Sequence, residues 1–140
     1  MSIRSDVSLF ASSAVALSVA MAIACGQSSN VKLMELQRVR SGSLDVVVLS
    51  ANDALRHGRD TFVIEFRSPD GMLVDVGDVR GSATMPMPSM PMFGSMAIKR
   101  SDVAGRYAVD GQFEMAGSWR ITIEWQSPSK GSVTFSGTVR

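Results

Sequence analysis

The segment from Met85 to Met92 holds the side chains with the clearest potential for chemistry. It reads Met-Pro-Met-Pro-Ser-Met-Pro-Met, so four of its eight residues offer a thioether sulfur. Thioether sulfur is soft and uncharged, and it prefers Cu(I) or Ag(I) to zinc, calcium or magnesium. No Asp or Glu occurs from residue 81 to residue 101, which leaves a hard cation without a carboxylate ligand there. The predicted ligands of a soft-metal site are Met85, Met87, Met90 and Met92, with Met96 and Met115 as possible additions.

The prolines between these methionines restrict the local structure. If residues 87–90 form a β-turn, Pro88 occupies the favoured second position, and the Cα atoms of Met87 and Met90 come within about 7 Å. Alternating prolines also remove backbone donors, which excludes the segment from a central strand. We therefore expect an edge, a polyproline-like strap or a loop, with its side chains available to a ligand.

Two other roles for the methionines remain open at this point. Methionine is an adaptable filler of protein cores, and methionine-rich surfaces also serve as docking patches for other proteins. The interleaved prolines favour an exposed strap over core packing. His57, the single histidine, lies in a polar stretch expected to be a loop, and nothing in the sequence brings it to the methionines.

The composition argues against catalysis and against nucleic-acid binding. The chain has no glycine-rich phosphate loop, no Cys-x-x-Cys pair and no His-Glu-x-x-His motif. With one histidine, serine nucleophiles lack a plausible base, and we predict that the protein is not an enzyme. Its 14 basic and 13 acidic residues give a net charge of +1, without the positive excess of a nucleic-acid binder.

The first 24 residues have the pattern of a secretory signal. Arg4 precedes a run from Val7 to Ile23 that is apolar apart from small serines, and small residues lead up to Cys25. The pattern resembles the bacterial lipoprotein signal, in which the cysteine is lipidated, although Ala22 stands where leucine is usual. We expect a signal peptide over 1–24, lipidation of Cys25 and a tether over 25–30. The alternative is an uncleaved anchor, because the run is close to the roughly 17 residues needed to span a bilayer.

Residues 31–140 are predicted to form one all-β domain. Apolar and polar residues alternate with a period of two, which is typical of strands with one buried face. The clearest runs are residues 61–67, 119–125 and 133–140. Weaker runs that also predict strands are residues 31–38, 44–50, 72–79, 95–100 and 106–113. Seven or eight short strands separated by turn residues predict an immunoglobulin-like β-sandwich. Tyr107, near a strand start, is interpreted either as a tyrosine corner or as an ordinary half-buried tyrosine.

Several motifs occur in a fixed order between about residue 58 and residue 125. They are Thr61-Phe62-Val63-Ile64-Glu65-Phe66, the turn Ser68-Pro69-Asp70-Gly71, the segment from Met85, Gly105-Arg106-Tyr107, and Phe113-Glu114-Met115-Ala116-Gly117-Ser118-Trp119. Together they resemble the YtkA-like domain family. The last motif, aromatic-x-Met-x-Gly-x-Trp leading into a strand, is the most specific of them.

The resemblance implies a small secreted or lipid-anchored β-sandwich, of a kind often found near heavy-metal efflux systems. It thus implies an envelope protein, facing the periplasm or the exterior, that handles copper or another soft metal. Relatives often carry histidine among the methionines, whereas this chain has none from Gly58 to Arg140. That difference favours Cu(I) over Cu(II).

The leading hypothesis is a non-enzymatic protein that binds Cu(I) or Ag(I) and either buffers the metal or hands it to an envelope transporter. The alternative is an interaction module that docks a partner, such as an efflux adaptor subunit, through the same methionines and prolines. A third option is an accessory domain of an enzyme without chemistry of its own.

Overall fold

The computed structural model describes residues 31–140. The predicted signal peptide, the tether and Cys25 lie outside the described residues. The described part of the chain forms eight β-strands: β1 (Met34–Ser41), β2 (Leu44–Ser50), β3 (Gly58–Arg67), β4 (Val79–Met85), β5 (Met92–Arg100), β6 (Arg106–Phe113), β7 (Gly117–Trp125) and β8 (Gly131–Val139). Within residues 31–140, no helix has the length and apolar character needed to cross a membrane.

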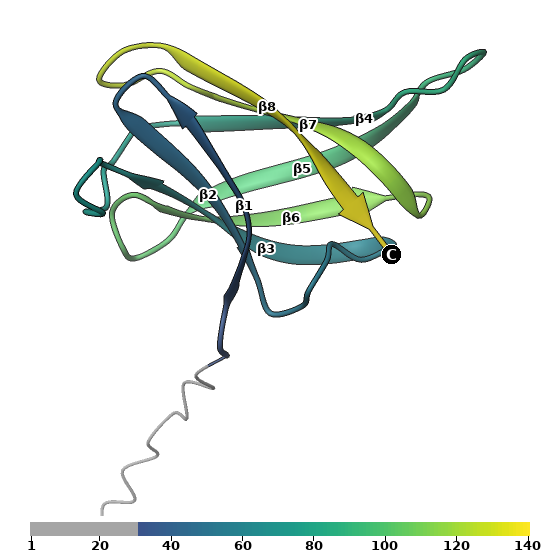
Figure 1. Ribbon diagram of the computed structural model, residues 1–140, viewed down its shortest axis with the longest axis horizontal. Coiled ribbons are helices and arrows are strands. Elements are labelled where there is room, and N and C mark those ends of the chain that lie inside the picture. The colour runs from purple at the N-terminus through teal and green to yellow at the C-terminus, as the bar shows by residue number, and fades with distance from the viewer. Residues whose placement is uncertain (1–30) are drawn as a thin grey trace, which may run out of the picture.

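All neighbouring strands pair antiparallel, in the order β1-β2-β3-β6-β5-β4-β7-β8. The sheet folds into two layers because β5 divides its pairing: residues 92–94 pair with β4, and residues 95–100 pair with β6. Figure 1 shows β1, β2, β3 and β6 in one layer and β4, β7 and β8 in the other. The predicted immunoglobulin-like β-sandwich of seven or eight strands is confirmed.

The core fills the space between the two layers. As the alternation predicted, Phe62, Ile64 and Phe66 of β3 are buried, and so are the inward residues of β7. The ring of Phe66 contacts Tyr107 and Trp125 edge to face, with centroids 5.5 and 5.2 Å apart. Such aromatic pairs add about 0.5–1.5 kcal/mol beyond the area they bury. These contacts join β3 and β6 to β7 on the opposite layer.

One predicted strand is wrong. Residues 72–78 form a loop, and β4 begins at Val79, where the predicted strand ended. The apolar pattern there has a different cause: Val76 is fully buried as part of a loop that covers one end of the sandwich. Gly77 adopts a φ of 74°, a left-handed conformation that turns the chain into β4.

Candidate functional site

The methionine-rich segment forms the tip of the β4–β5 hairpin, which extends beyond the rest of the sandwich (Figure 1). Met85 is the last residue of β4 and Met92 the first of β5, and the two face each other directly in the antiparallel register. Residues opposite each other in such a ladder point to the same face of the sheet. Met85 is 7% exposed and belongs to the core, and Met92 packs against that core. This pair therefore lies at the inner base of the hairpin.

The remaining two methionines of the segment lie at its exposed tip. The chain reverses direction at Pro88 and Ser89, where the sequence predicted a turn. Met87 and Met90 are 39% and 73% exposed. Each lies two residues beyond the pair at the base, on its own arm of the hairpin. The prediction of an exposed strap is therefore correct for the tip, but it is wrong for Met85 and Met92, which belong to strands β4 and β5 and pack in or against the core.

Met115 is brought to the same end of the molecule by the β6–β7 turn. A Cβ atom on Gly117 would lie 2.8 Å from Cε of Met85, so the methyl group of Met85 rests on the backbone of Gly117. Met115 precedes Gly117 by two residues and is 44% exposed. Its carbonyl accepts a hydrogen bond of 2.9 Å from Nε1 of Trp119. The β5–β6 ladder ends with Ser95 opposite Gln112, and Met115 lies in the turn that follows β6. Met115 is therefore two residues from the backbone on which Met85 rests.

Met96 lies deeper along β5 and packs within the sandwich. Its Cε is 2.9 Å from the position that a Cβ atom on Gly81 would take, so it covers the backbone of β4. Gly94 separates it from Met92 along the inner face of β5. The structure shows a packing contact for Met96, and its role as a ligand stays a prediction.

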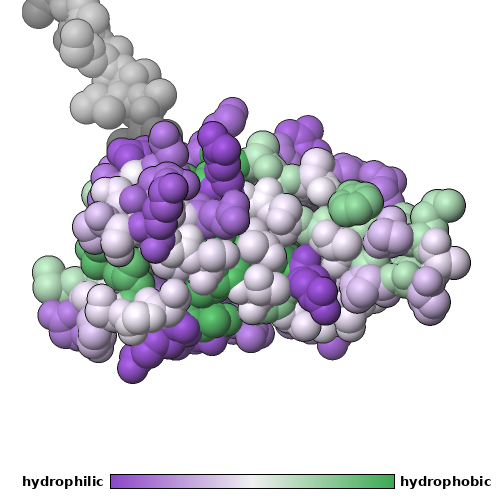
Figure 2. Space-filling view, turned by 90° about the horizontal axis from the view of Figure 1, so that it is seen from above, coloured by the Kyte–Doolittle hydropathy of each residue, from purple (hydrophilic) through white to green (hydrophobic). Residues whose placement is uncertain are grey.

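The hairpin carries no charged side chain over most of its length. No Asp, Glu, Lys, Arg or His occurs between Arg80 and Lys99. Phe93, on the outer face beside the base of the hairpin, is 72% exposed. In Figure 2 the end of the molecule formed by this hairpin carries pale colours, whereas strongly hydrophilic side chains lie over other parts of the view. The tip thus presents sulfur and hydrocarbon to solvent.

His57 lies near the β6–β7 turn, a position that the sequence does not predict. Its Nε2 is 3.0 Å from the backbone carbonyl of Glu114, the residue before Met115, and the imidazole is exposed. The contact follows from the pairing of β3 with β6, in which Gly58 faces Phe113. Because 57 positions separate His57 from Glu114, no local sequence pattern signals their proximity.

The described carboxylates do not provide a site for a hard metal ion. Within residues 31–140, no three His, Cys, Asp or Glu side chains are grouped so that they could hold a metal. The buried carboxylate of Glu65 accepts hydrogen bonds from Arg67 and Arg106, and that of Asp45 accepts them from Arg38 and Arg40. The donors at the hairpin are thioethers, which suit a soft monovalent ion.

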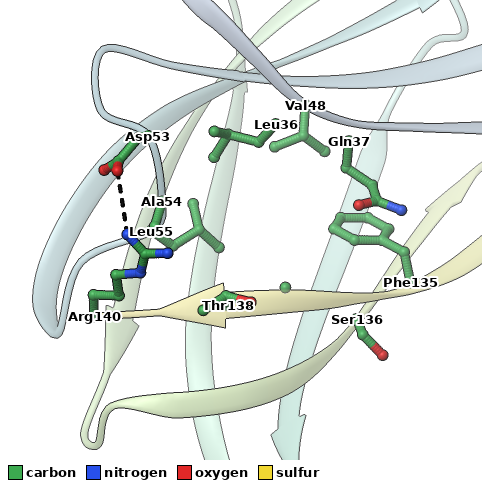
Figure 3. A pocket seen from close by; sticks show the side chains of 11 residues that line it. Leu36, Gln37, Val48, Asp53, Ala54, Leu55, Phe135, Ser136, Thr138 and Arg140 are labelled. Carbon is green, nitrogen blue, oxygen red and sulfur yellow. Dashed lines mark hydrogen bonds and ion pairs between the residues drawn. The ribbon is translucent and has the colours of Figure 1, made fainter.

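A separate crevice of about 170 Å³ lies between β1, β8 and the loop of residues 51–57. Leu36, Val48 and Leu55 line its apolar wall, as Figure 3 shows. At its rim, Nη1 of Arg140 is 3.2 Å from Oδ2 of Asp53. Binding sites for small molecules usually measure about 300–1,000 Å³. The crevice is smaller than that and contains no sulfur or imidazole, so we do not assign it as the site.

The fold and the hairpin define a class of protein, namely a small β-sandwich with a methionine-rich hairpin at one end. The model of the YtkA-like family matches residues 40–124. The chain therefore belongs to the YtkA-like family, and the resemblance predicted from its motifs is confirmed over a longer stretch than those motifs span.

Among solved structures, the crystal structure of the Lin-41 filamin domain is similar, with 17% sequence identity and a TM-score of 0.44. That similarity covers 62% of this chain and 81% of the filamin domain. No curated protein matches the chain.

Proposed function

We propose that this member of the YtkA-like family is a non-enzymatic envelope protein that binds Cu(I) or Ag(I) through the β4–β5 hairpin. The observation that carries the proposal is the placement of Met85 directly opposite Met92, with Met87 and Met90 exposed beyond them. Opposed Cβ atoms of an antiparallel pair lie about 4.5–5.5 Å apart, so two flexible thioethers can meet at one ion. The absence of charged side chains between Arg80 and Lys99 disfavours harder cations.

The proposed location rests on the N-terminal sequence and on the family. A lipoprotein-type signal ending before Cys25 would place the sandwich outside the cytoplasm, anchored to a membrane by lipid. A single cysteine used for lipidation leaves no free thiol to oxidise in that compartment. Copper is then the cargo of the protein, received from or passed to an envelope transporter.

A titration with Cu(I) under reducing conditions tests the proposal. All eight strands and the described core lie within residues 34–139, so a chain starting at residue 26 keeps the whole sandwich. We expect this chain to bind Cu(I) and a variant with leucine at positions 85, 87, 90 and 92 to lose that binding. Leucine roughly conserves the volume of methionine and costs less than about 1.5 kcal/mol per site. Equal copper uptake by both proteins would remove the hairpin from the mechanism.

The exposed side chains of Met90 and Phe93 favour a second candidate function, which is docking of a partner subunit. Exposed apolar groups gathered at one end of a small protein are typical of an interaction site. Affinity capture from solubilised membranes distinguishes this function from metal binding. If neither protein binds copper and the Met90→Ser, Phe93→Ser variant loses a membrane partner that the native chain retains, docking is the function.

A further inference from the structure

The four methionines of the hairpin form two pairs that differ sharply in exposure. The inner pair is Met85 and Met92, at the base, and the outer pair is Met87 and Met90, at the tip. Exposure rises from 7% at Met85 to 39% at Met87 and 73% at Met90. The two pairs are therefore not equivalent sites for a metal ion.

The prolines hold the two pairs at a fixed separation. Pro86 lies between Met85 and Met87 on one arm of the hairpin, and Pro91 lies between Met90 and Met92 on the other. Two residues of extended chain span about 6.6–6.8 Å, a gap that the mobile ends of methionine side chains can narrow. Proline fixes φ and removes a backbone donor, so the outer pair is presented on stiff arms.

The surroundings give the two pairs different coordination. Met85 of the inner pair rests on the backbone of Gly117, and Met115 precedes Gly117 by two residues, so the β6–β7 turn offers a third thioether at this end of the molecule. The outer pair has solvent around it and no third methionine beyond it on the hairpin. An ion held between Met85 and Met92 is sheltered on the side of the core, and Met115 would complete its coordination from the more exposed turn. An ion held by the outer pair is open to an incoming ligand.

From these differences we infer that the outer pair is a transfer site, and that the inner pair with Met115 is the holding site. A Cu(I) or Ag(I) ion passes between the two pairs and leaves from the tip to a partner that offers thiolate or thioether donors. Each step exchanges one sulfur–metal bond for another, and the ion keeps its charge throughout. The inference rests on the proposed function, because it divides one metal-binding hairpin into two stages.

The division into a holding site and a transfer site is tested by NMR spectroscopy on the chain that starts at residue 26. Its methionine methyl groups are labelled with ¹³C, and their signals are followed as Ag(I) is added. In the native protein we expect Ag(I) to shift the methyl signals of Met85, Met92 and Met115 at the first equivalent. The Met87→Leu, Met90→Leu variant should keep these shifts but release Ag(I) to glutathione about tenfold more slowly, in line with a higher barrier to exchange. Met72→Leu is the matched control, because Met72 is 67% exposed in the loop between β3 and β4.

The outcomes separate this inference from the proposed function. If no methionine signal of the native protein shifts, both fail. If the signals shift but Met87→Leu, Met90→Leu releases Ag(I) at the native rate, the hairpin binds metal and the transfer role of its tip is wrong. Loss of all binding in that variant would place the holding site at the tip, which also overturns the inference.

Discussion

The hydroxyl group of Tyr107 donates a hydrogen bond of 2.7 Å to the backbone carbonyl of Gly77. The same oxygen accepts a bond of 3.3 Å from the N–H of Val76, and the tyrosine is buried. A tyrosine corner bonds backbone only a few residues away, whereas this phenol reaches back 30 residues to another loop. Neither interpretation from the sequence is therefore correct. The Tyr107 hydroxyl therefore links the start of β6 to the loop before β4 through two hydrogen bonds.

Replacing Tyr107 with phenylalanine should lower the free energy of unfolding by about 1–2 kcal/mol. The substitution leaves the ring in place and removes the partner of the buried N–H of Val76 and of the partly buried carbonyl of Gly77, whose desolvation is then uncompensated. Urea denaturation of the native chain and the variant measures the difference. No loss of stability would show that water replaces the hydroxyl without cost.

The same variant should also respond differently to alkaline pH. Burial raises the pKa of the Tyr107 phenol above its ordinary value. The unfolded chain then loses this proton at a lower pH than the folded protein does. The stabilisation by the neutral phenol is fully present below about pH 10, which is the pKa of tyrosine in the unfolded chain. It is lost as the pH rises through the higher pKa that Tyr107 has in the folded protein. The stability gap between the native chain and Tyr107→Phe should narrow above about pH 10, and a constant gap would contradict this.

Asp45 should make the protein sensitive to acid. A hydrogen bond of 2.8 Å from Nε of Arg40 lowers the pKa of the Asp45 carboxyl group below its ordinary value. The stabilisation by the ionised Asp45 carboxylate is present above about pH 3.9, which is the pKa of aspartate in the unfolded chain. It is lost as the pH falls through the lower pKa that Asp45 has in the folded protein. We expect the Asp45→Asn variant to lose less stability than the native chain between about pH 5 and pH 3, as measured by urea denaturation at each pH. Parallel pH profiles would contradict this.

The inner and outer methionines should differ in their effect on stability. Met85→Ala leaves a cavity in the core and should cost about 2–5 kcal/mol. Met90→Ala changes an exposed side chain and should alter stability by no more than about 0.5 kcal/mol. Denaturation of the two variants without metal provides the comparison. Equal costs would mean that the base of the hairpin is not packed as the structure shows.

The bounds of β2 and β6 agree with the prediction, although both came from weaker runs. In β6 the buried residues alternate with more exposed ones, whereas in β2 the continuous apolar run Val46-Val47-Val48-Leu49 is buried throughout. Strand β4 escaped prediction because Gly81, Ser82 and Ala83 carry little hydrophobic signal, although the narrow space beside β5 requires small residues. Alternation alone does not distinguish such a strand from the loop before it.

The candidate site was predictable in residue type but not in arrangement. The methionines and prolines are adjacent in the chain, so a hairpin with exposed thioethers could be expected from local sequence. The burial of Met85 against Gly117 and the contact of His57 with Glu114 depend on strand pairings between distant segments. Such pairings depend on how all the strands of the sandwich assemble, so no pattern in the local sequence predicts them.

The two layers are joined at both of their borders. At one border they share the continuous backbone of β5, which pairs with β4 through residues 92–94 and with β6 through residues 95–100. At the other border the loop before β3 bonds to the end of β8: the N–H of Leu55 donates to the carbonyl of Thr138 at 3.2 Å, and the N–H of Arg140 donates to the carbonyl of Leu55 at 2.8 Å. The methionine hairpin leaves the sandwich at the border made by β5, so strand pairing holds the base of both of its arms.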